Sequence, residues 1–412
     1  MYASDKYMNR KILITIVSVV VVVTVGVSIW FFFFRTTTPA PTTSPATGLP
    51  FGEGGGNVAP GEQNSNIVGT ISDSGSKATN KLFQISDAPV AGFVAFSPKK
   101  DSPTVIRYVD RATGHIYDVN PFTLEKTKIT NNTLPKIIET YFKNDGSAVL
   151  LRSLANNDTI QNISLALNAP RASSTDALYT VTATGLRGNM GDVWVGPNNS
   201  LAYSLIDDNS ISISNFDGTK ATRLFSSPFT DWRVRFDNIA NVVLVTKASA
   251  NVSGFAYNLN TKTGSLSKLI GPLNALTLVE SPDNERFAYS YNSKGQTIFA
   301  LQTIDTGEIT NILPATFADK CVWSKKNTST LYCGTPSNIG AYEPDNWYQG
   351  TSHFSDQIWS FDTVNKIAEN LASPGGNTNA GIDVLNPSLS PNEDYLVFMN
   401  KNDLTLWALK LQ

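Results

Sequence analysis

The stretch SPDNERFAYSYNSKGQTIFALQTIDTGEITNIL, residues 281–313, determines the fold of this chain. A Ser-Pro turn is followed by an apolar strand, a second apolar strand, and a shorter, more polar one. Short runs of β-forming residues bounded by Asn, Asp, Gly or Ser are typical of buried strands. Because proline has no N–H to donate to a neighbouring strand, Pro282 ends the strand before it and begins the turn.

The same passage occurs seven times between Phe96 and Leu411. A repeat in the forties that is built only from strands is typical of a β-propeller blade. We therefore predict an all-β fold, a seven-bladed β-propeller, over residues 81–412. Six or eight blades, an open sandwich or two separate β-domains remain alternatives. The turn anchors, spaced by 46, 53, 41, 44, 43 and 66 residues, are Ser97, Lys143, Gly196, Asp237, Ser281, Ser324 and Ser390.

The last copy lacks a fourth strand, because Gln412 follows directly after its third. The segment KLFQIS, residues 81–86, precedes the first copy and resembles the fourth strands of the others, such as TRLFSS at 222–227. An N-terminal strand that completes the final blade would leave the ring without open edges. We therefore predict closure of the last blade by this segment.

The copies at 281–313 and 390–411 resemble the WD40-like repeats of the TolB type, in which a Ser-Pro turn separates two strands. The resemblance implies an extracytoplasmic propeller that binds proteins. Only one Gly-His pair, Gly114-His115, and no Trp-Asp pair occurs, so the repeated pairs of true WD40 blades are absent, and the chain has no room for the additional α/β domain of TolB. The role of TolB in envelope-spanning complexes is therefore not carried over.

Residues 12–34 are uncharged and dominated by Val, Ile and Phe. As a helix they would extend roughly 34 Å, enough to cross a bilayer. Three basic residues precede the segment, so the positive-inside rule predicts a cytoplasmic tail at 1–11 and an extracytoplasmic propeller, at the cell surface or in the periplasm. Residues 35–80, rich in Pro, Gly, Ser and Thr, are predicted to be a flexible linker. A cleaved signal peptide is the alternative to this membrane anchor.

The net charge of the 412-residue chain is −2, and no basic stripe occurs, so we expect no nucleic acid partner. The two cysteines, Cys321 and Cys333, are placed symmetrically about Asn327, the expected tip of a hairpin. A cross-strand disulfide suits an exported domain, whereas two buried thiols are the alternative. Two cysteines and two histidines are too few and too scattered for a zinc site, and we expect no metal and no cofactor.

The sixth copy carries a long insertion, GTPSNIGAYEPDNWYQGTSHFSDQ at 334–357, between its second and third strands. Aromatic side chains on a loop of a rigid scaffold favour recognition, so the insertion is the predicted binding site. The alternative is a satellite core that covers the end of the central channel. The candidate binding residues are Tyr342, Glu343, Asp345, Trp347, Tyr348, His353 and Phe354.

No catalytic motif occurs, so we predict that the protein is not an enzyme. The leading hypothesis is a non-enzymatic, membrane-tethered scaffold that binds a protein or an envelope component through the insertion. It predicts that replacing Trp347 and Tyr348 by Ala leaves the fold intact. A glycan or small-ligand binder is the alternative, followed by an envelope hydrolase or lyase. An enzyme would require acids, bases or a metal near the propeller axis, and carboxylates with perturbed ionisation there would support it.

Overall fold

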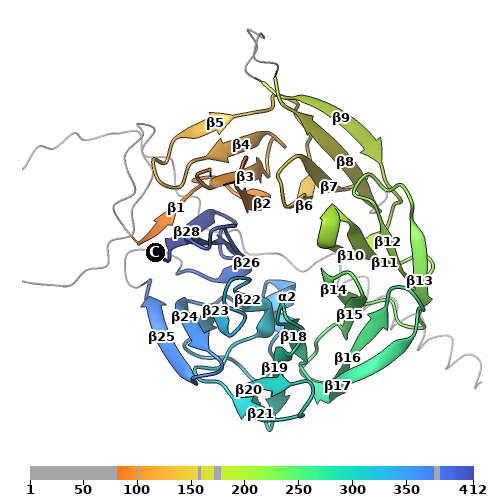
Figure 1. Ribbon diagram of the computed structural model, residues 1–412, viewed down its shortest axis with the longest axis vertical. Helices are drawn as coiled ribbons and strands as arrows, with labels where there is room; N and C mark the ends of the chain where they lie inside the picture. The colour runs from red at the N-terminus through yellow and green to blue at the C-terminus, as the bar shows by residue number, and fades with distance from the viewer. Residues whose placement is uncertain (1–80, 101, 156–158, 171–177, 375–380) are drawn as a thin grey trace, which may run out of the picture. The chain divides into compact units, whose positions relative to one another are not determined.

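A computed structural model describes residues 81–412, except 101, 156–158, 171–177 and 375–380. Within these limits the chain forms seven four-stranded antiparallel sheets arranged around an axis, as Figure 1 shows. The predicted all-β, seven-bladed β-propeller is confirmed. The predicted cytoplasmic tail, transmembrane helix and linker lie outside the described residues. None of the helices in the described part of the chain is long and apolar enough to cross a membrane.

Each of the first four blades takes its strands from consecutive segments, with the innermost strand first. Blade 1 contains β2 (Val90–Phe96), β3 (Val105–Asp110), β4 (Ile116–Val119) and β5 (Lys126–Lys128). Blade 2 contains β6 (Ile137–Phe142), β7 (Ala148–Leu154), β8 (Ile160–Asn168) and β9 (Thr180–Gly185). Blade 3 contains β10 (Met190–Val195), β11 (Leu201–Leu205), β12 (Ser210–Ser214) and β13 (Thr222–Ser226). Blade 4 contains β14 (Trp232–Asn238), β15 (Asn241–Thr246), β16 (Ser253–Asn260) and β17 (Leu266–Asn274).

The last three blades follow the same order, except that the outermost strand of blade 7 comes from the start of the described chain. Blade 5 contains β18 (Thr277–Glu280), β19 (Arg286–Ser293), β20 (Gln296–Thr303) and β21 (Ile309–Asn311). Blade 6 contains β22 (Cys321–Trp323), β23 (Thr330–Pro336), β24 (Asp356–Asp362) and β25 (Ile367–Ala372). Blade 7 contains β26 (Val384–Leu389), β27 (Tyr395–Asn400), β28 (Leu406–Lys410) and β1 (Leu82–Gln84). The described helices are α2 (Asp345–Gln349) and the 3-10 turns η1 (Pro197–Asn199) and η2 (Ala318–Lys320).

Strand β1 closes the ring as predicted. It pairs antiparallel with β28, in a register that places Leu82 opposite Leu409 and Phe83 opposite Ala408. Phe83 is buried and contacts Tyr395 of the same blade edge to face. The loss of water contact by these apolar side chains stabilises the closed blade.

Apolar side chains fill the space between neighbouring blades. On β14, for example, Trp232, Val234 and Phe236 are buried and pack against Ala202 and Ile211 of blade 3. The intervening residues of β14 are charged and less buried. This alternation is the strand periodicity of two, which directs every second side chain into the core. It also leaves polar side chains beside the propeller axis.

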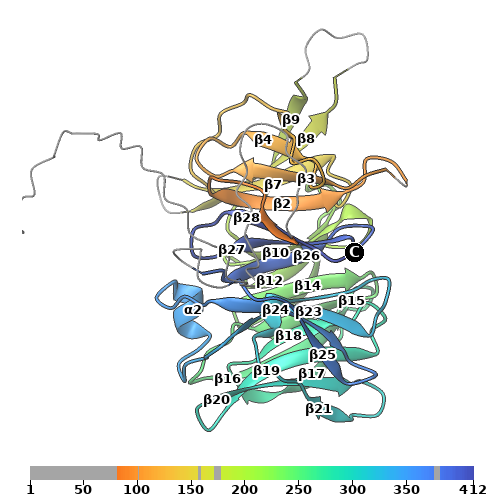
Figure 2. The same cartoon turned by 90° about the vertical axis from the view of Figure 1, so that its left-hand side faces the viewer.

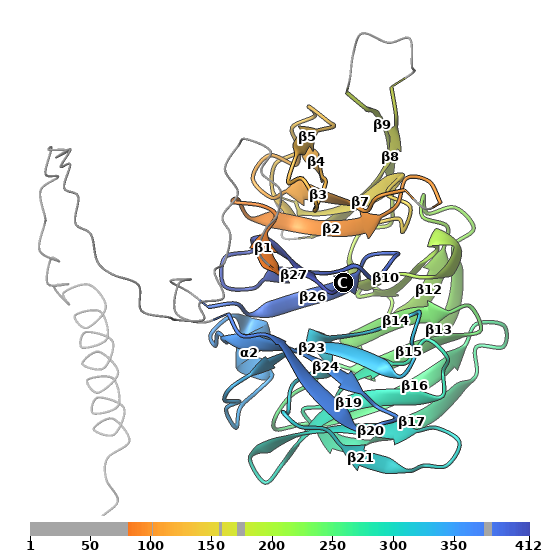
Figure 3. The same ribbon diagram turned by 60° about the vertical axis from the view of Figure 1, so that its left-hand side comes forward.

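The two ends of the inner strands define two faces of the propeller. We call the face that carries the turns between the first and second strands the turn face. The opposite face carries residues 337–355, between β23 and β24, which we call the plug segment and which includes α2. Figures 2 and 3 show α2 on one face and the turn that follows β2 on the other.

Candidate functional site

Helix α2 of the plug segment is attached to the propeller through a buried tryptophan. Trp347 is 2% exposed, and its Nε1 donates to both carboxylate oxygens of Asp383, each at 3.0 Å. Its backbone N–H donates to Glu343 at 2.9 Å, and Glu343 is also buried. A buried indole N–H requires such an acceptor, because an unpaired donor costs about 1–3 kcal/mol.

An ion triad lies beneath this helix. Lys320 Nζ is 2.6 Å from Asp356 Oδ2 and also donates to Asp383. Backbone N–H groups of Phe354 and Val384 donate to the two carboxylates, at 3.1 and 2.7 Å. Burial raises the pKa of Asp356 to about 6, although the Lys320 charge acts in the opposite direction. Buried charges require such partners, since each loses its hydration.

Tyr348, the neighbour of Trp347, covers the inner strand β14. Its ring lies 4.9 Å from the Arg233 guanidinium, and its hydroxyl donates to Asp319. Burial raises the pKa of Tyr348 well above its ordinary value, and the Asp319 charge adds to this effect. The cavity left between Tyr348, β14 and β18 measures about 10 Å³. That volume holds one water molecule at most, so the plug segment is packed closely against this end of the inner strands.

The structure separates the seven predicted binding residues into two groups. Tyr342 is 65% exposed and His353 is exposed. The other members are at least partly buried in packing or hydrogen bonds: Asp345 accepts from the Ala250 N–H, and Phe354 contacts Phe317. The burial of Trp347 argues against the expectation that this residue can be replaced without damage to the fold. A partner-binding role for the exposed members stays a prediction.

The predicted disulfide is present. Cys321 and Cys333 lie directly opposite each other on β22 and β23, with their Cα atoms 4.1 Å apart and an S–S distance of 2.10 Å. Both residues are buried in the core between blades 5 and 6. The bond therefore joins the first two strands of the blade that carries the plug segment.

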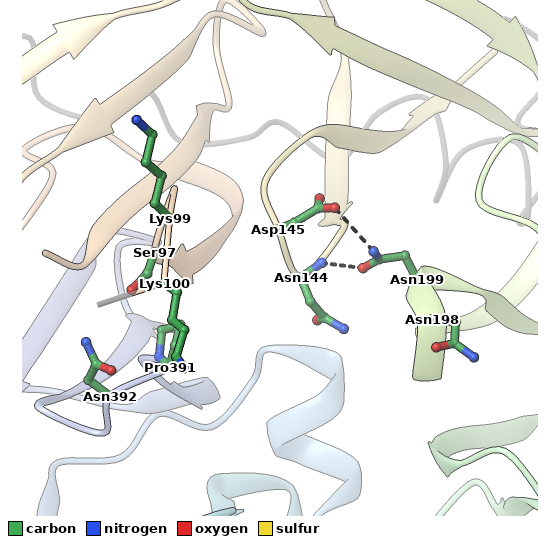
Figure 4. A pocket seen from close by; sticks show the side chains of 9 residues that line it. All are labelled: Ser97, Lys99, Lys100, Asn144, Asp145, Asn198, Asn199, Pro391 and Asn392. Carbon is green, nitrogen blue, oxygen red and sulfur yellow. Dashed lines mark hydrogen bonds between the residues drawn. The ribbon is translucent and has the colours of Figure 1, made fainter. Parts of the chain in front are cut away.

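The turn face contains a cavity with a volume of about 460 Å³. Figure 4 shows side chains from blades 1 and 7 on one side of it and side chains from blades 2 and 3 on the other. It is lined by Ser97, Lys99, Lys100, Asn144, Asp145, Asn198, Asn199, Pro391 and Asn392.

Hydrogen bonds hold only part of this lining. The Asn144 N–H donates to the Asn199 side chain at 2.8 Å, and the Asn199 amide donates to Asp145 at 3.4 Å. Asn198 has φ 56° and ψ 27°, a left-handed conformation that Asn tolerates better than most residues. Among the described residues, six further polar side chains of the lining have no hydrogen-bond partner. These are Ser97, Lys99, Lys100, Asn144, Asn198 and Asn392.

Sequence reasoning did not identify this cavity. Its residues belong to the turns, and Pro, Asn, Asp and Ser are the ordinary residues of turns. The only available signal was the unusual chemistry of two turns, Lys-Lys at 99–100 and Asn-Asn at 198–199. Nothing in the sequence states that the two turns face the same cavity.

Carboxylates with perturbed ionisation lie on the inner strands β14 and β18. Burial raises the pKa of Glu280 to about 7, and the nearby Asp237 carboxylate adds to the effect. Desolvation also raises the pKa of Asp237, although its side chain is solvent-accessible, and this carboxylate accepts a hydrogen bond from Trp194 Nε1 at 3.3 Å. These two residues lie at the ends of their strands next to the turn face. Carboxylates with perturbed ionisation near the propeller axis are the feature expected of an enzyme, and Glu280 and Asp237 on the inner strands are such residues.

The polar side chains near the axis do not form a metal site in the described part of the chain. No group of three or more His, Cys, Asp or Glu side chains there is placed to hold a metal ion. Asp192, whose pKa is raised by burial, is instead paired with Arg233 at 3.5 Å.

No family model and no curated protein matches this chain. Solved structures of similar fold include an oligogalacturonate lyase from Vibrio parahaemolyticus, which is 12% identical in sequence. The superposition covers 80% of this chain and 93% of the lyase, with a TM-score of 0.52. An oligogalacturonate lyase in complex with manganese is 10% identical, with coverages of 82% and 95% and a TM-score of 0.53. TolB from Acinetobacter baumannii is 14% identical, with coverages of 69% and 63% and a TM-score of 0.43.

These comparisons correct the functional prediction. The non-enzymatic scaffold was inferred from a propeller fold without catalytic motifs, and enzymes are found among solved structures with the same fold. It also required the plug segment to present its aromatic residues, whereas Trp347 is buried. The prediction of a non-enzymatic interaction scaffold is therefore wrong. The similarity itself, at 10–12% identity, shows the fold alone.

Proposed function

We propose that this protein binds an acidic carbohydrate in the cavity of the turn face. The observation that carries the proposal is the lining of this cavity, in which the side chains of two lysines and three asparagines have no partner among the described residues. Unpaired ammonium and amide groups match the carboxylates and hydroxyls of a sugar acid. Asp145 is the one acidic residue of the lining, so positive charge predominates.

The size and the polarity of the cavity support a small hydrophilic ligand. A volume of about 460 Å³ lies within the range of roughly 300–1,000 Å³ that is usual for ligand sites. Such sites are mostly apolar, whereas eight of the nine residues that line this cavity carry polar side chains. The lyases of similar fold are named for oligogalacturonate, itself an acidic sugar chain. Because that likeness concerns the fold, the argument for an anion depends on Lys99 and Lys100.

The location of the protein is part of the proposal. We infer a membrane-anchored propeller outside the cytoplasm, whose blades belong to the TolB-type WD40-like repeats. The Cys321–Cys333 disulfide supports an oxidising compartment, because cytosolic thiols are kept reduced. The uncharged residues 12–34 support the anchor, and the Ser-Pro turns at 281–282 and 390–391 support the repeat class.

Calorimetric titration of the full chain with oligogalacturonate tests the binding proposal. A neutral oligosaccharide of similar length serves as the ligand control. We expect saturable binding of the acidic sugar that weakens with salt, and a loss of at least about tenfold in affinity for Lys99→Ala/Lys100→Ala. Lys247→Ala/Lys262→Ala, which removes two exposed lysines outside the cavity, is the matched control. Equal affinity in both double variants would refute the proposal.

A second candidate function is acid–base chemistry on the bound sugar. It is favoured by Glu280, whose pKa of about 7 allows a carboxyl group to take up and release protons near neutral pH. If oligogalacturonate is cleaved, Glu280→Gln should abolish turnover and leave affinity unchanged. Wild-type protein that binds the sugar without cleaving it would exclude this second function and leave the first intact.

A further inference from the structure

The triad beneath the plug segment contains the reactants of a condensation. Lys320 ends η2, Asp356 begins β24, and Asp383 precedes β26. Their side chains are 0% exposed, and Lys320 Nζ is in hydrogen-bond contact with both carboxylates. The rings of Trp347 and Phe354 lie against the amine, with centroids at 4.9 and 5.1 Å. An amine and two carboxyl groups are thus held together away from water.

The two carboxyl groups are not equivalent. Both oxygens of Asp383 accept hydrogen bonds from Trp347 Nε1, and one also accepts from the Phe354 N–H. On Asp356, Oδ2 accepts from Lys320 and the Val384 N–H. Its Oδ1 is buried and has no partner among the described residues.

An ionised oxygen in the position of Asp356 Oδ1 would carry a large desolvation cost. A neutral carboxylic acid avoids much of this cost by placing its hydroxyl there. Burial raises the pKa of Asp356 to about 6, which increases the fraction of the neutral acid near neutral pH. Asp383, both of whose oxygens accept hydrogen bonds, is the carboxylate placed to act as the base. The Lys320 amine therefore contacts both an electrophilic carboxylic acid, Asp356, and a base, Asp383.

We propose that Lys320 and Asp356 form an intramolecular amide bond, with Asp383 as the base. Asp383 takes one proton from the Lys320 ammonium, and the free Nζ attacks Cγ of Asp356. The C–Oδ1 bond then breaks, and the departing hydroxide leaves as water with a second proton from Nζ. Nζ has lost two protons, one to Asp383 and one to the water, so atoms and charge balance. No oxidant or cofactor is required.

The surrounding groups fit the product as well as the reactants. Oδ2 of Asp356 becomes the amide oxygen and keeps the hydrogen bond from the Val384 N–H. The remaining hydrogen of Nζ faces Asp383. Oδ1, the atom without a partner, is the one that leaves. The reaction converts buried charges into neutral groups, which removes the desolvation cost of the ion pair.

Mass spectrometry of the wild-type full chain tests the proposal after reduction of the disulfide. We expect a chain one water molecule lighter than its sequence. Trypsin should leave Lys320 uncut, within a fragment of residues 295–325 joined to 327–366, the fragment that contains Asp356. A chain of unchanged mass, cleaved after Lys320, would refute the amide. A link to 367–401, which contains Asp383, would refute the choice of Asp356.

Two variants separate the roles of the residues. Lys320→Arg keeps the positive charge but cannot form this amide, so its fragments should separate. Asp383→Asn keeps the shape of the base but not its proton affinity, and its chain should also remain unlinked. A linked Asp383→Asn chain would overturn the role of Asp383. The wild-type result decides the amide itself even if neither variant folds.

Discussion

Charged side chains are buried and paired at one end of the inner strands and exposed and unpaired at the other. Beneath the plug segment, Lys320 is completely buried and both of its acidic neighbours are hydrogen-bonded. On the turn face, Lys99 and Lys100 are exposed, and their side chains have no hydrogen-bond partner within the described residues. A buried charge with its partners stabilises one arrangement of the chain, whereas a hydrated charge without a partner is available to a ligand. We therefore expect substitutions at the first end to change stability and those at the second to change binding.

The largest effect is expected from Asp383→Ala. This change leaves the Trp347 N–H without its acceptor and removes one of the two carboxylates that contact Lys320 Nζ, in a site closed to water. Breaking a buried pair from one side costs about 3–5 kcal/mol of the free energy of unfolding. Guanidinium denaturation measures it, with Glu369→Ala, an exposed carboxylate of β25, as the control. Similar losses in the two variants would show that the triad is not structural.

Removing the disulfide should loosen the same end of the molecule by a smaller amount. The bond closes a loop of sequence separation 12, for which we expect about 2–3 kcal/mol of stabilisation. Unfolding with and without a reductant measures the effect in the wild type. Cys321→Ala/Cys333→Ala should not respond to the reductant. Sugar affinity should be unchanged under non-denaturing conditions, and a loss of affinity would show that the two ends are coupled.

At the open end, Asn198→Gly should weaken binding without changing stability. Glycine adopts the positive φ of this position without strain, so the turn is kept while the unpaired amide is lost. We expect an affinity loss of about fivefold to tenfold, which corresponds to a net hydrogen bond of about 1 kcal/mol. Titration calorimetry and thermal unfolding provide the two readouts. A stability loss above about 1 kcal/mol would show that the amide supports the fold.

The smallest effect expected is a change of stability with pH that depends on Glu280. Its pKa is about 7 in the folded protein and 4.5 ordinarily, so the folded state holds the proton more tightly. Stability therefore falls as pH rises from about 4.5 to 7 and stays low above that range. Because the side chain is only partly buried, we expect on the order of 1 kcal/mol.

Unfolding free energies at pH 5 and pH 8 measure this effect. The wild type should lose stability relative to Glu280→Gln between the two values, because glutamine does not titrate. The comparison isolates Glu280 from Asp237 and Asp356, which titrate in both proteins. Parallel pH profiles would mean that Glu280 ionises as it does in the unfolded chain.

The fold could be predicted from the sequence because each blade repeats its own local signals. Pro98, Pro282 and Pro391 mark turns regardless of what the rest of the chain does. The candidate site could not be predicted in the same way. In the sequence, Trp347 resembles an exposed binding residue. The contact that explains its burial is with Asp383, which is 36 residues away in the chain and is brought next to the indole N–H only by the fold. The cavity likewise depends on four turns that only the closed ring brings together.

The pairing of β1 with β28 has a consequence for biosynthesis. The Ser86 hydroxyl accepts a hydrogen bond from the Leu406 N–H, across a separation of 320 residues. During translation, β1 therefore cannot pair until β28 has been synthesised, and blade 7 forms only after residues 406–410 have left the ribosome. Until then the hydrophobic Leu82 and Phe83 lack their partners. A chaperone that shields this segment in the nascent chain would prevent premature association between copies.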